Sequence, residues 1–253
     1  MRSIVRRLII AAVLSIWGAL AASPATAEEV TVAVAANFTE PARQIAGAFE
    51  KATGDHVTLS FGASGQFYTQ IANGAPFEVF LSADADRPAK AEQAGLAVSG
   101  SRFTYAVGKL VLWSPTAGLV DAKGAVLRGD RFAKLSIADP AAAPYGVAAI
   151  QTMKTLGVYD RVQPRIVQGA SIAQAFQFVK TGNAELGFVA LSQVINEPGG
   201  SRWLVPEADH DPIVQQAVLL KTAGDSKAAR EFLAFLKSAR AGAIIHRFGY
   251  ATP

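Results

Sequence analysis

The chain has 253 residues, no cysteine, and a formal net charge of +4 at pH 7 from 24 basic and 20 acidic residues. The lack of cysteine excludes disulfides, thiolate metal sites and cysteine nucleophiles. Three of the basic residues lie in the first seven positions, before the uncharged stretch 8–22 and a small-x-small pattern at 25–27. This order is typical of a signal peptide, so we expect residues 1–27 to be cleaved near Ala27 and the protein to be exported.

Removal of this segment changes the charge argument. The mature chain keeps 21 basic residues against 20 acidic ones, and this balance gives no electrostatic basis for binding nucleic acid. The alternative for the N-terminal stretch is a membrane anchor, but about 20 apolar residues are needed to span a bilayer. The remaining 226 of the 253 residues can bury a good core, in one large domain or two smaller ones.

Strand-like and helix-like segments alternate from Val30 onward. Hydrophobic periodicity predicts, in order, a strand at 30–35, a helix over 42–53 that stops at Gly54, a strand at 56–61, a helix at 66–73, a strand at 77–81 and a helix at 86–94. The runs EVTVAVAA and KLVLW are apolar at successive positions, as in strands that are covered on both faces. The repetition predicts an α/β fold with mainly parallel strands.

A second cycle begins near Lys109. Its predicted elements are a strand at 135–138, a helix at 145–156, a strand at 165–167, a helix at 172–181, a strand at 185–190, a surface turn at 198–200 and two final helices at 226–238 and 240–248. No low-complexity linker separates the two cycles. We therefore expect two lobes, with residues 28–108 and 216–253 in the first and 109–215 in the second. The chain would cross between them along strands near 105–113 and 213–220, with a cleft between the lobes.

Four breaks between a strand and a helix carry small or polar residues. Asn37 and Ser64 lie in two of them, Ile172 follows Ser171 in the third, and Tyr145 follows Pro144 in the fourth. In open α/β sheets the ligand crevice lies beyond the carboxyl ends of the strands, and helix N-termini there suit an anion. Taken singly, Asn37 and Ser64 could be plain helix caps and Tyr145 could simply pack its ring. Four breaks, two in each half, favour one shared anion site as strongly as separate caps.

Enzyme chemistry finds less support in the sequence. Ser64 lies in GASGQ, which lacks the second glycine of the Gly-x-Ser-x-Gly motif, and the chain has only three histidines. A serine hydrolase using Ser64 is therefore a minor alternative. The acidic stretch 207–211 is the one candidate for metal ligands, and we expect it to be a solvated loop. No phosphate-binding loop or Gly-x-Gly-x-x-Gly motif follows a strand, so we expect no metal, no cofactor and no enzyme activity.

Four segments, in order, resemble the periplasmic molybdate-binding proteins of bacterial molybdate ABC transporters. They are VAVAANFTEPARQIAGAFEKATG, LSFGASGQFYTQIANGAPFEVFLSAD, ADPAAAPYG and AELGFVALSQV, and the likeness runs from about Val30 to Tyr250. The resemblance implies a type II periplasmic binding protein, with two α/β lobes that are joined by two crossing strands and close over one tetrahedral oxyanion. It also implies molybdate or tungstate as the ligand, a membrane permease as the partner, a monomer, and a periplasmic location.

The family's ligand-binding positions fall on Asn37, Ser64, Tyr145 and Ile172. The resemblance implies side-chain and backbone donors from Asn37 and Ser64, and a backbone N–H from Ile172. Many family members have serine at the position of Asn37. Others have tyrosine where this chain has Ala190, and we expect the phenol of Tyr145 to replace it from the other side of the cleft.

The donors expected at these positions carry no charge. Several charge-assisted hydrogen bonds, each worth about 1.5–3 kcal/mol, can offset the cost of desolvating a dianion. A phosphate that carries a proton would need an acceptor carboxylate, and the four breaks offer none that we expect to contact the ligand. Sulfate has the right charge and no proton, so only the size of the cavity could exclude it. A binding protein for another oxyanion such as sulfate is therefore the nearer alternative.

Overall fold

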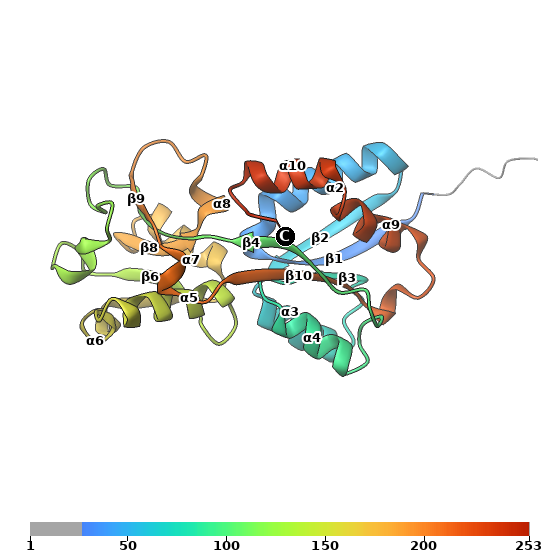
Figure 1. The fold of residues 1–253 in the computed structure, drawn as a ribbon, viewed down its shortest axis with the longest axis horizontal. Coiled ribbons are helices and arrows are strands. Elements are labelled where there is room, and N and C mark those ends of the chain that lie inside the picture. Colours follow the sequence, from blue (N-terminus) through green and yellow to red (C-terminus); the bar gives the residue numbers. More distant parts are fainter. Residues whose placement is uncertain (1–26, 253) are drawn as a thin grey trace, which may run out of the picture.

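Two α/β lobes lie side by side in the computed structural model, which describes residues 27–252 (Figure 1). The predicted signal peptide, residues 1–27, lies outside this part of the chain except for Ala27. Within residues 27–252 no helix is long and apolar enough to cross a membrane. The predicted two-lobed α/β fold is confirmed.

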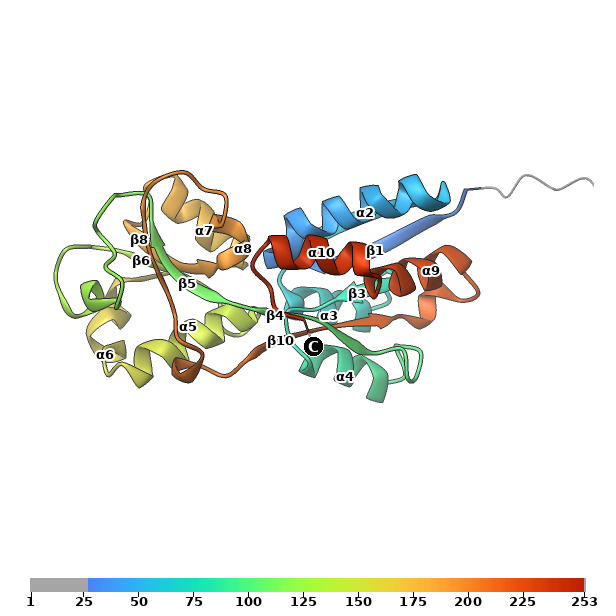
Figure 2. The ribbon, with the colours of Figure 1, turned by 45° about the horizontal axis from the view of Figure 1, so that its top comes forward.

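The first lobe contains a five-stranded sheet in the order β2-β1-β3-β10-β4. Its strands are β1 (Glu29–Ala35), β2 (His56–Gly62), β3 (Val79–Leu81), β4 (Phe103–Gly108) and β10 (Ile213–Leu219). The sheet is accompanied by η1 (Ala36–Phe38), α2 (Thr39–Thr53), α3 (Ser64–Ala72), α4 (Asp86–Gln93), η5 (Lys221–Ala223), α9 (Lys227–Leu236) and α10 (Ala239–Arg247). The last two helices bring the C-terminal end of the chain back to this lobe (Figure 2).

Successive residues of β1 face opposite sides of the sheet, which explains their unbroken apolar run. Val32 and Val34 pack in one core with Phe232 of α9 and Ile245 of α10. Ala33, between them, belongs to the opposite core, which includes residues of α3 and α4. The sheet is therefore covered on both faces, as the sequence predicts.

The second lobe repeats this plan with a sheet in the order β7-β6-β8-β5-β9. Its strands are β5 (Leu110–Ser114), β6 (Leu135–Ala138), β7 (Ile166–Gly169), β8 (Leu186–Ala190) and β9 (Ser201–Leu204). Its helices are η2 (Ala125–Arg128), α5 (Pro144–Thr155), α6 (Tyr159–Val162), η3 (Gln163–Arg165), α7 (Ile172–Lys180) and α8 (Leu191–Val194), followed by η4 (Glu207–Asp209). Hydrophobic periodicity predicts neither α8 nor β9, both of which are only four residues long.

The chain passes between the lobes twice. Strand β4 continues through Lys109 into β5, and β9 leads through residues 205–212 into β10. In each sheet one strand runs antiparallel to its neighbours, β10 in the first and β5 in the second. Each of these strands enters its lobe from the other lobe, so it starts at the border where the neighbouring strands end. The remaining pairs β1–β2, β1–β3, β6–β7 and β6–β8 are parallel.

Candidate anion-binding site

Four helical N-termini, two from each lobe, meet at one small buried cavity. Ser64 and Ile172 are the first residues of α3 and α7, and Asn37 and Tyr145 are the second residues of η1 and α5. All four line a cavity of about 10 Å³. A space of this size holds about one water molecule.

The parallel strands bring these residues together. Asn37 follows β1 and Ser64 follows β2, which pair in register over their whole length. Tyr145 and Ile172 follow the neighbouring strands β6 and β7 in the same way. The carboxyl ends of both strand pairs face the border between the lobes, which is where open α/β sheets place their ligands.

The wall of the cavity favours a small anion. It contains no charged side chain, since the other lining residues are Ala35, Ala36, Gly62, Ala63, Ala83, Ala143 and Pro144. The first N–H groups of a helix have no partner inside that helix, and the helix dipole makes this end positive. Helices α3, α5 and α7, of 9, 12 and 9 residues, all begin at the cavity. Such a wall can donate hydrogen bonds to an anion from several directions and offers few acceptors to a protonated one.

Ser64 is buried, and its hydroxyl is not a helix cap. Ala63 holds the N-cap position of α3, where no side chain makes a capping hydrogen bond. The Ser64 Oγ instead accepts a hydrogen bond from the Ala83 N–H at 2.9 Å. A serine hydroxyl that accepts one bond keeps its own proton to donate. The cavity wall has no histidine, lysine or carboxylate that could remove this proton, as a hydrolase would require.

Asn37 is also buried, and its side chain bonds with other buried groups. The Asn37 Nδ2 donates to the Gln215 Oε1 at 2.8 Å and to the Tyr250 hydroxyl at 2.9 Å. An amide NH₂ has two hydrogens, so both are engaged away from a ligand. A side-chain bond from Asn37 to the anion therefore stays a prediction, and the backbone N–H is its other donor at the cavity.

Tyr145 is fully buried, and its hydroxyl reaches the strands that join the lobes. The Gln215 Nε2 donates to this hydroxyl at 3.4 Å. A Cβ on Gly108, the last residue of β4, would lie only 2.1 Å from the same hydroxyl, so a larger residue here would force the phenol to move. The phenol of Tyr145 as a direct ligand of the anion stays a prediction. Its place at the start of α5 also brings the residue's backbone to the cavity.

Ile172 is the first residue of α7, and Ala190 is the residue before α8. Of these two residues, only Ile172 lines the cavity. Ser171 caps α7 by accepting a hydrogen bond from the Gln174 N–H at 3.3 Å, which leaves the start of α7 open to the cavity. Ala190, at the end of β8, is buried and is not part of the cavity wall. Residues 207–209 form η4, and the described part of the chain contains no group of three or more potential metal ligands.

A buried polar network that the sequence patterns do not predict lies behind the cavity. The Tyr250 hydroxyl donates to the Asn37 carbonyl oxygen at 2.7 Å, and the Ser192 Oγ donates to the same oxygen at 2.7 Å. The Tyr105 hydroxyl donates to the Gln215 Oε1 at 3.0 Å. One signal was available: Gln215 and Gln216 are two polar residues in the otherwise apolar strand IVQQAVL.

Burial keeps the three tyrosines of this network neutral. It raises the pKa of Tyr250 to about 12 and raises the pKa values of Tyr105 and Tyr145 well above the usual value of 10. The phenols therefore stay protonated at neutral pH and place no negative charge beside the cavity.

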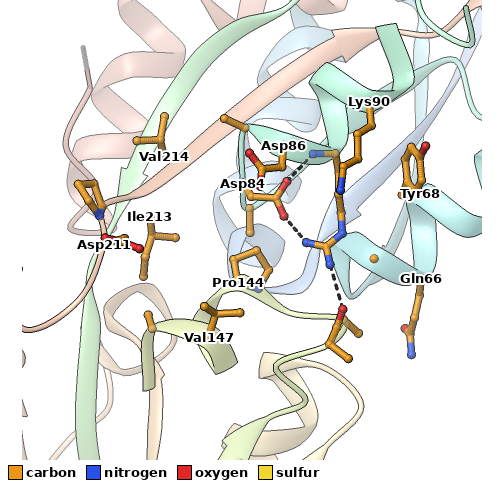
Figure 3. A pocket seen from close by; sticks show the side chains of 18 of the residues that line it. Gln66, Tyr68, Asp84, Asp86, Lys90, Pro144, Val147, Asp211, Ile213 and Val214 are labelled. Atoms are coloured by element: carbon orange, nitrogen blue, oxygen red, sulfur yellow. Dashed lines mark hydrogen bonds and ion pairs between the residues drawn. The ribbon is translucent and has the colours of Figure 1, made fainter. Parts of the chain in front are cut away.

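The lobes touch on the side where α3 and α4 face α5. The Gly65 N–H donates to the Ala142 carbonyl oxygen at 2.9 Å, and the Arg87 Nη2 donates to the Ala141 carbonyl oxygen at 3.1 Å. Arg87 is also paired with Asp84. These contacts border an open cleft of about 820 Å³, which Figure 3 shows with Asp84 and Pro144 on its two sides. Ala83 and Pro144 line both the cleft and the small cavity, so the two are adjacent.

Two α/β lobes, two connecting segments and a small cavity between them define a class, the two-lobed solute-binding proteins. The chain belongs to the family of bacterial extracellular solute-binding proteins, which matches residues 30–251. A protein of Rhodobacter capsulatus named "Molybdate-binding protein ModA" is 59% identical over 231 residues, covering 91% of each chain. A protein of the same name from Azotobacter vinelandii is 54% identical, covering 94% of this chain and 96% of the relative.

A solved structure agrees with these relatives. The periplasmic molybdate-binding protein of Azotobacter vinelandii superimposes with a TM-score of 0.86 at 45% identity, and the match covers 88% of this chain and 99% of that structure. These relatives are named for binding and not for catalysis. The resemblance predicted from the sequence is confirmed.

Proposed function

We propose that this protein is the extracytoplasmic solute-binding component of a molybdate ABC transporter, which captures molybdate, and also tungstate, between its lobes. The observation that carries the proposal is the meeting of four helical N-termini at one small cavity without a charged side chain. The names of the most similar relatives supply the identity of the anion.

Each predicted site residue has a role in this proposal. The backbone N–H groups of Asn37, Ser64, Tyr145 and Ile172 donate to the oxygens of the anion, two from each lobe. The Ser64 hydroxyl adds a side-chain donor, since its own acceptor position is already filled by the Ala83 N–H. The anion receives hydrogen bonds from both lobes only when the lobes are closed, so it binds the closed arrangement more tightly than the open one. This difference in affinity determines how far binding shifts the protein toward the closed arrangement.

The same donors explain which anions would be rejected. Hydrogen phosphate brings a proton that needs an acceptor, and a buried polar group without a partner costs about 1–3 kcal/mol. Sulfate carries no proton, so it differs from molybdate in size alone. A sulfate-binding protein is therefore the alternative with the same fold and the same donors.

Titration calorimetry on residues 28–253 tests the proposal, with molybdate, tungstate, sulfate and phosphate added in turn. We expect one-to-one binding of the first two anions and no heat from the last two. Tight binding of sulfate in preference to molybdate would move the protein to a different transporter. Absence of binding by all four anions would contradict an oxyanion-binding role.

The remaining features of the proposal concern the whole protein. Residues 28–108 and 216–253, together with the start of β10 at 213–215, form the first lobe and residues 109–212 the second, and the mature protein is a monomer. Residues 1–27 direct export to the periplasm and are removed near Ala27. The closed, loaded form then delivers the anion to a membrane permease.

A further inference from the structure

Gln215 lies where the returning strand β10 enters the first lobe, and its side chain is completely buried. The pairing of β10 with β4 shifts register between Gln215 and Gln216. A bulge of this kind re-aims successive side chains. Gln216 bonds with Thr104 and Arg102 near the surface, whereas Gln215 bonds only with buried groups behind the cavity.

The Gln215 amide links one cavity residue from each lobe. Its Oε1 accepts hydrogen bonds from the Asn37 Nδ2 at 2.8 Å and from the Tyr105 hydroxyl at 3.0 Å. Its Nε2 donates to the Tyr145 hydroxyl at 3.4 Å. Asn37 belongs to the first lobe and Tyr145 to the second, so these bonds can exist together only when the lobes are closed.

Glycine at position 108 makes this arrangement possible. A Cβ there would lie 2.1 Å from the Tyr145 hydroxyl and 2.6 Å from the Gln215 Nε2. Both groups therefore occupy the space beside β4 that any other residue would fill.

We propose that Gln215 is a positioning residue for anion binding, which joins Asn37 and Tyr145 across the lobes and must be uncharged to do so. The inference rests on the proposed function and extends it to a residue outside the cavity wall. A carboxylate at the same place could accept the bonds from Asn37 and Tyr105. Its negative charge would, however, be separated from a bound dianion only by Asn37 or Tyr145. The two negative charges would repel each other in a buried region where screening is weak.

One charged group acts on the surroundings of Gln215: the carboxylate of Asp84, which is paired with Arg87, lies close enough to Tyr105 to raise the pKa of its phenol. The titratable groups that face it are the phenols of Tyr105 from β4, Tyr145 from α5 and Tyr250 from the C-terminal segment, and all three stay protonated because they are buried. Among residues 27–252, no charged side chain makes a hydrogen bond to Gln215.

The decisive variant is Gln215→Glu, with Gln216→Glu as the matched control on the same strand. Burial raises the pKa of a carboxyl group, so the new side chain becomes charged only as the pH rises. Calorimetry with molybdate at pH 6, 7.5 and 9 should show affinity at least tenfold weaker than that of the unaltered protein at pH 9, with recovery toward pH 6. The control and the unaltered protein should change by less than threefold over this range.

A residue that only supports the fold would lower the melting temperature without making the affinity depend on pH. Gln215→Glu that is folded and binds within threefold of the unaltered protein at pH 9 would therefore overturn the inference.

Gln215→Met covers the case in which the glutamate variant does not fold. Methionine keeps the length of the side chain but makes none of its hydrogen bonds. Stopped-flow fluorescence with molybdate should show dissociation at least fivefold faster, with association within twofold. If the unaltered protein binds molybdate and dissociation is unchanged in this variant, the inference about Gln215 is overturned while the proposed function stands. If the unaltered protein does not bind it, the proposed function fails and takes the inference with it.

Discussion

The hydroxyl of Ser64 combines burial, a filled acceptor position and a free proton at the start of a helix. We expect Ser64→Ala to weaken molybdate binding at least tenfold, or by about 1.4 kcal/mol, as measured by calorimetry. Ser114→Ala is a suitable control, because Ser114 is buried and its Oγ also accepts a backbone N–H bond, from Thr116, away from the cavity. Equal affinity in the two folded variants would show that the Ser64 hydroxyl does not bind the anion.

The three buried phenols predict loss of stability in alkali. Below pH 10 they are protonated in both the folded and the unfolded chain, so they cause no change of stability with pH. Between pH 10 and the raised folded pKa, which is about 12 for Tyr250, only the unfolded chain releases these protons. The unfolded state then binds fewer protons, so the free energy of unfolding falls as the pH rises.

For Tyr250 alone this loss reaches about 2–3 kcal/mol by pH 12, at 1.36 kcal/mol per pH unit. Thermal melts between pH 8 and 12 should show a flat region to about pH 10 and then a steep fall. Absorbance of tyrosinate should rise for these residues together with unfolding. Ionisation of all tyrosines near pH 10 while the fold is intact would contradict the burial argument.

At the scale of the element, the first turn of α3 touches the opposite lobe so closely that a methyl group would interfere. A Cβ on Gly65 would lie 2.9 Å from the Arg87 Nη2 and 3.0 Å from the Ala142 Cα. We expect Gly65→Ala to weaken molybdate binding at least tenfold in calorimetry, because the lobes can no longer close fully. The unliganded variant should keep its melting temperature, since alanine suits a helix better than glycine does.

Gly47→Ala provides the matched comparison in α2. Apart from the neighbouring backbone of α2 itself, no heavy atom lies within 4 Å of the position that its Cβ would occupy. Its affinity should therefore equal that of the unaltered protein. If Gly65→Ala binds as tightly as Gly47→Ala, the contact between α3 and the Ala142 loop does not control closure.

At the scale of the whole molecule, the Arg87 guanidinium connects the lobes at the edge of the cleft. The guanidinium donates to the Ala141 carbonyl oxygen and is paired with Asp84. Beside this contact, the Gly65 N–H donates to the Ala142 carbonyl oxygen. Arg87→Met should speed molybdate dissociation about three- to tenfold, in line with about 0.5–1.5 kcal/mol for a hydrogen bond at a partly exposed site. Stopped-flow measurement of the dissociation rate provides the check.

The control for this variant is Lys90→Met. Lys90 lies one turn further along α4 and lines the same cleft, but its side chain makes no hydrogen bond or ion pair to the second lobe among the described residues. Equal dissociation rates for the two variants would mean that the arginine does not hold the lobes together.

The candidate site could be predicted to a large extent because its parts are local. Helix starts after strands are encoded by a few neighbouring residues, and Asn37, Ser64, Tyr145 and Ile172 each lie at such a start. The structure places all four on one cavity wall. Their direct contacts with the anion stay a prediction.

The amino-acid sequence by itself determined most of the α/β elements and the four breaks, because periodicity, capping chemistry and small-residue turns act over a few residues. The export signal stays a prediction from the sequence. Only the tertiary structure decided what lies behind the site. Asn37 meets Gln215 and Tyr250 across 178 and 213 residues of chain, and no local pattern specifies such a contact. It also decided the direction of β5 and β10, since a strand's direction depends on which lobe the chain has just left.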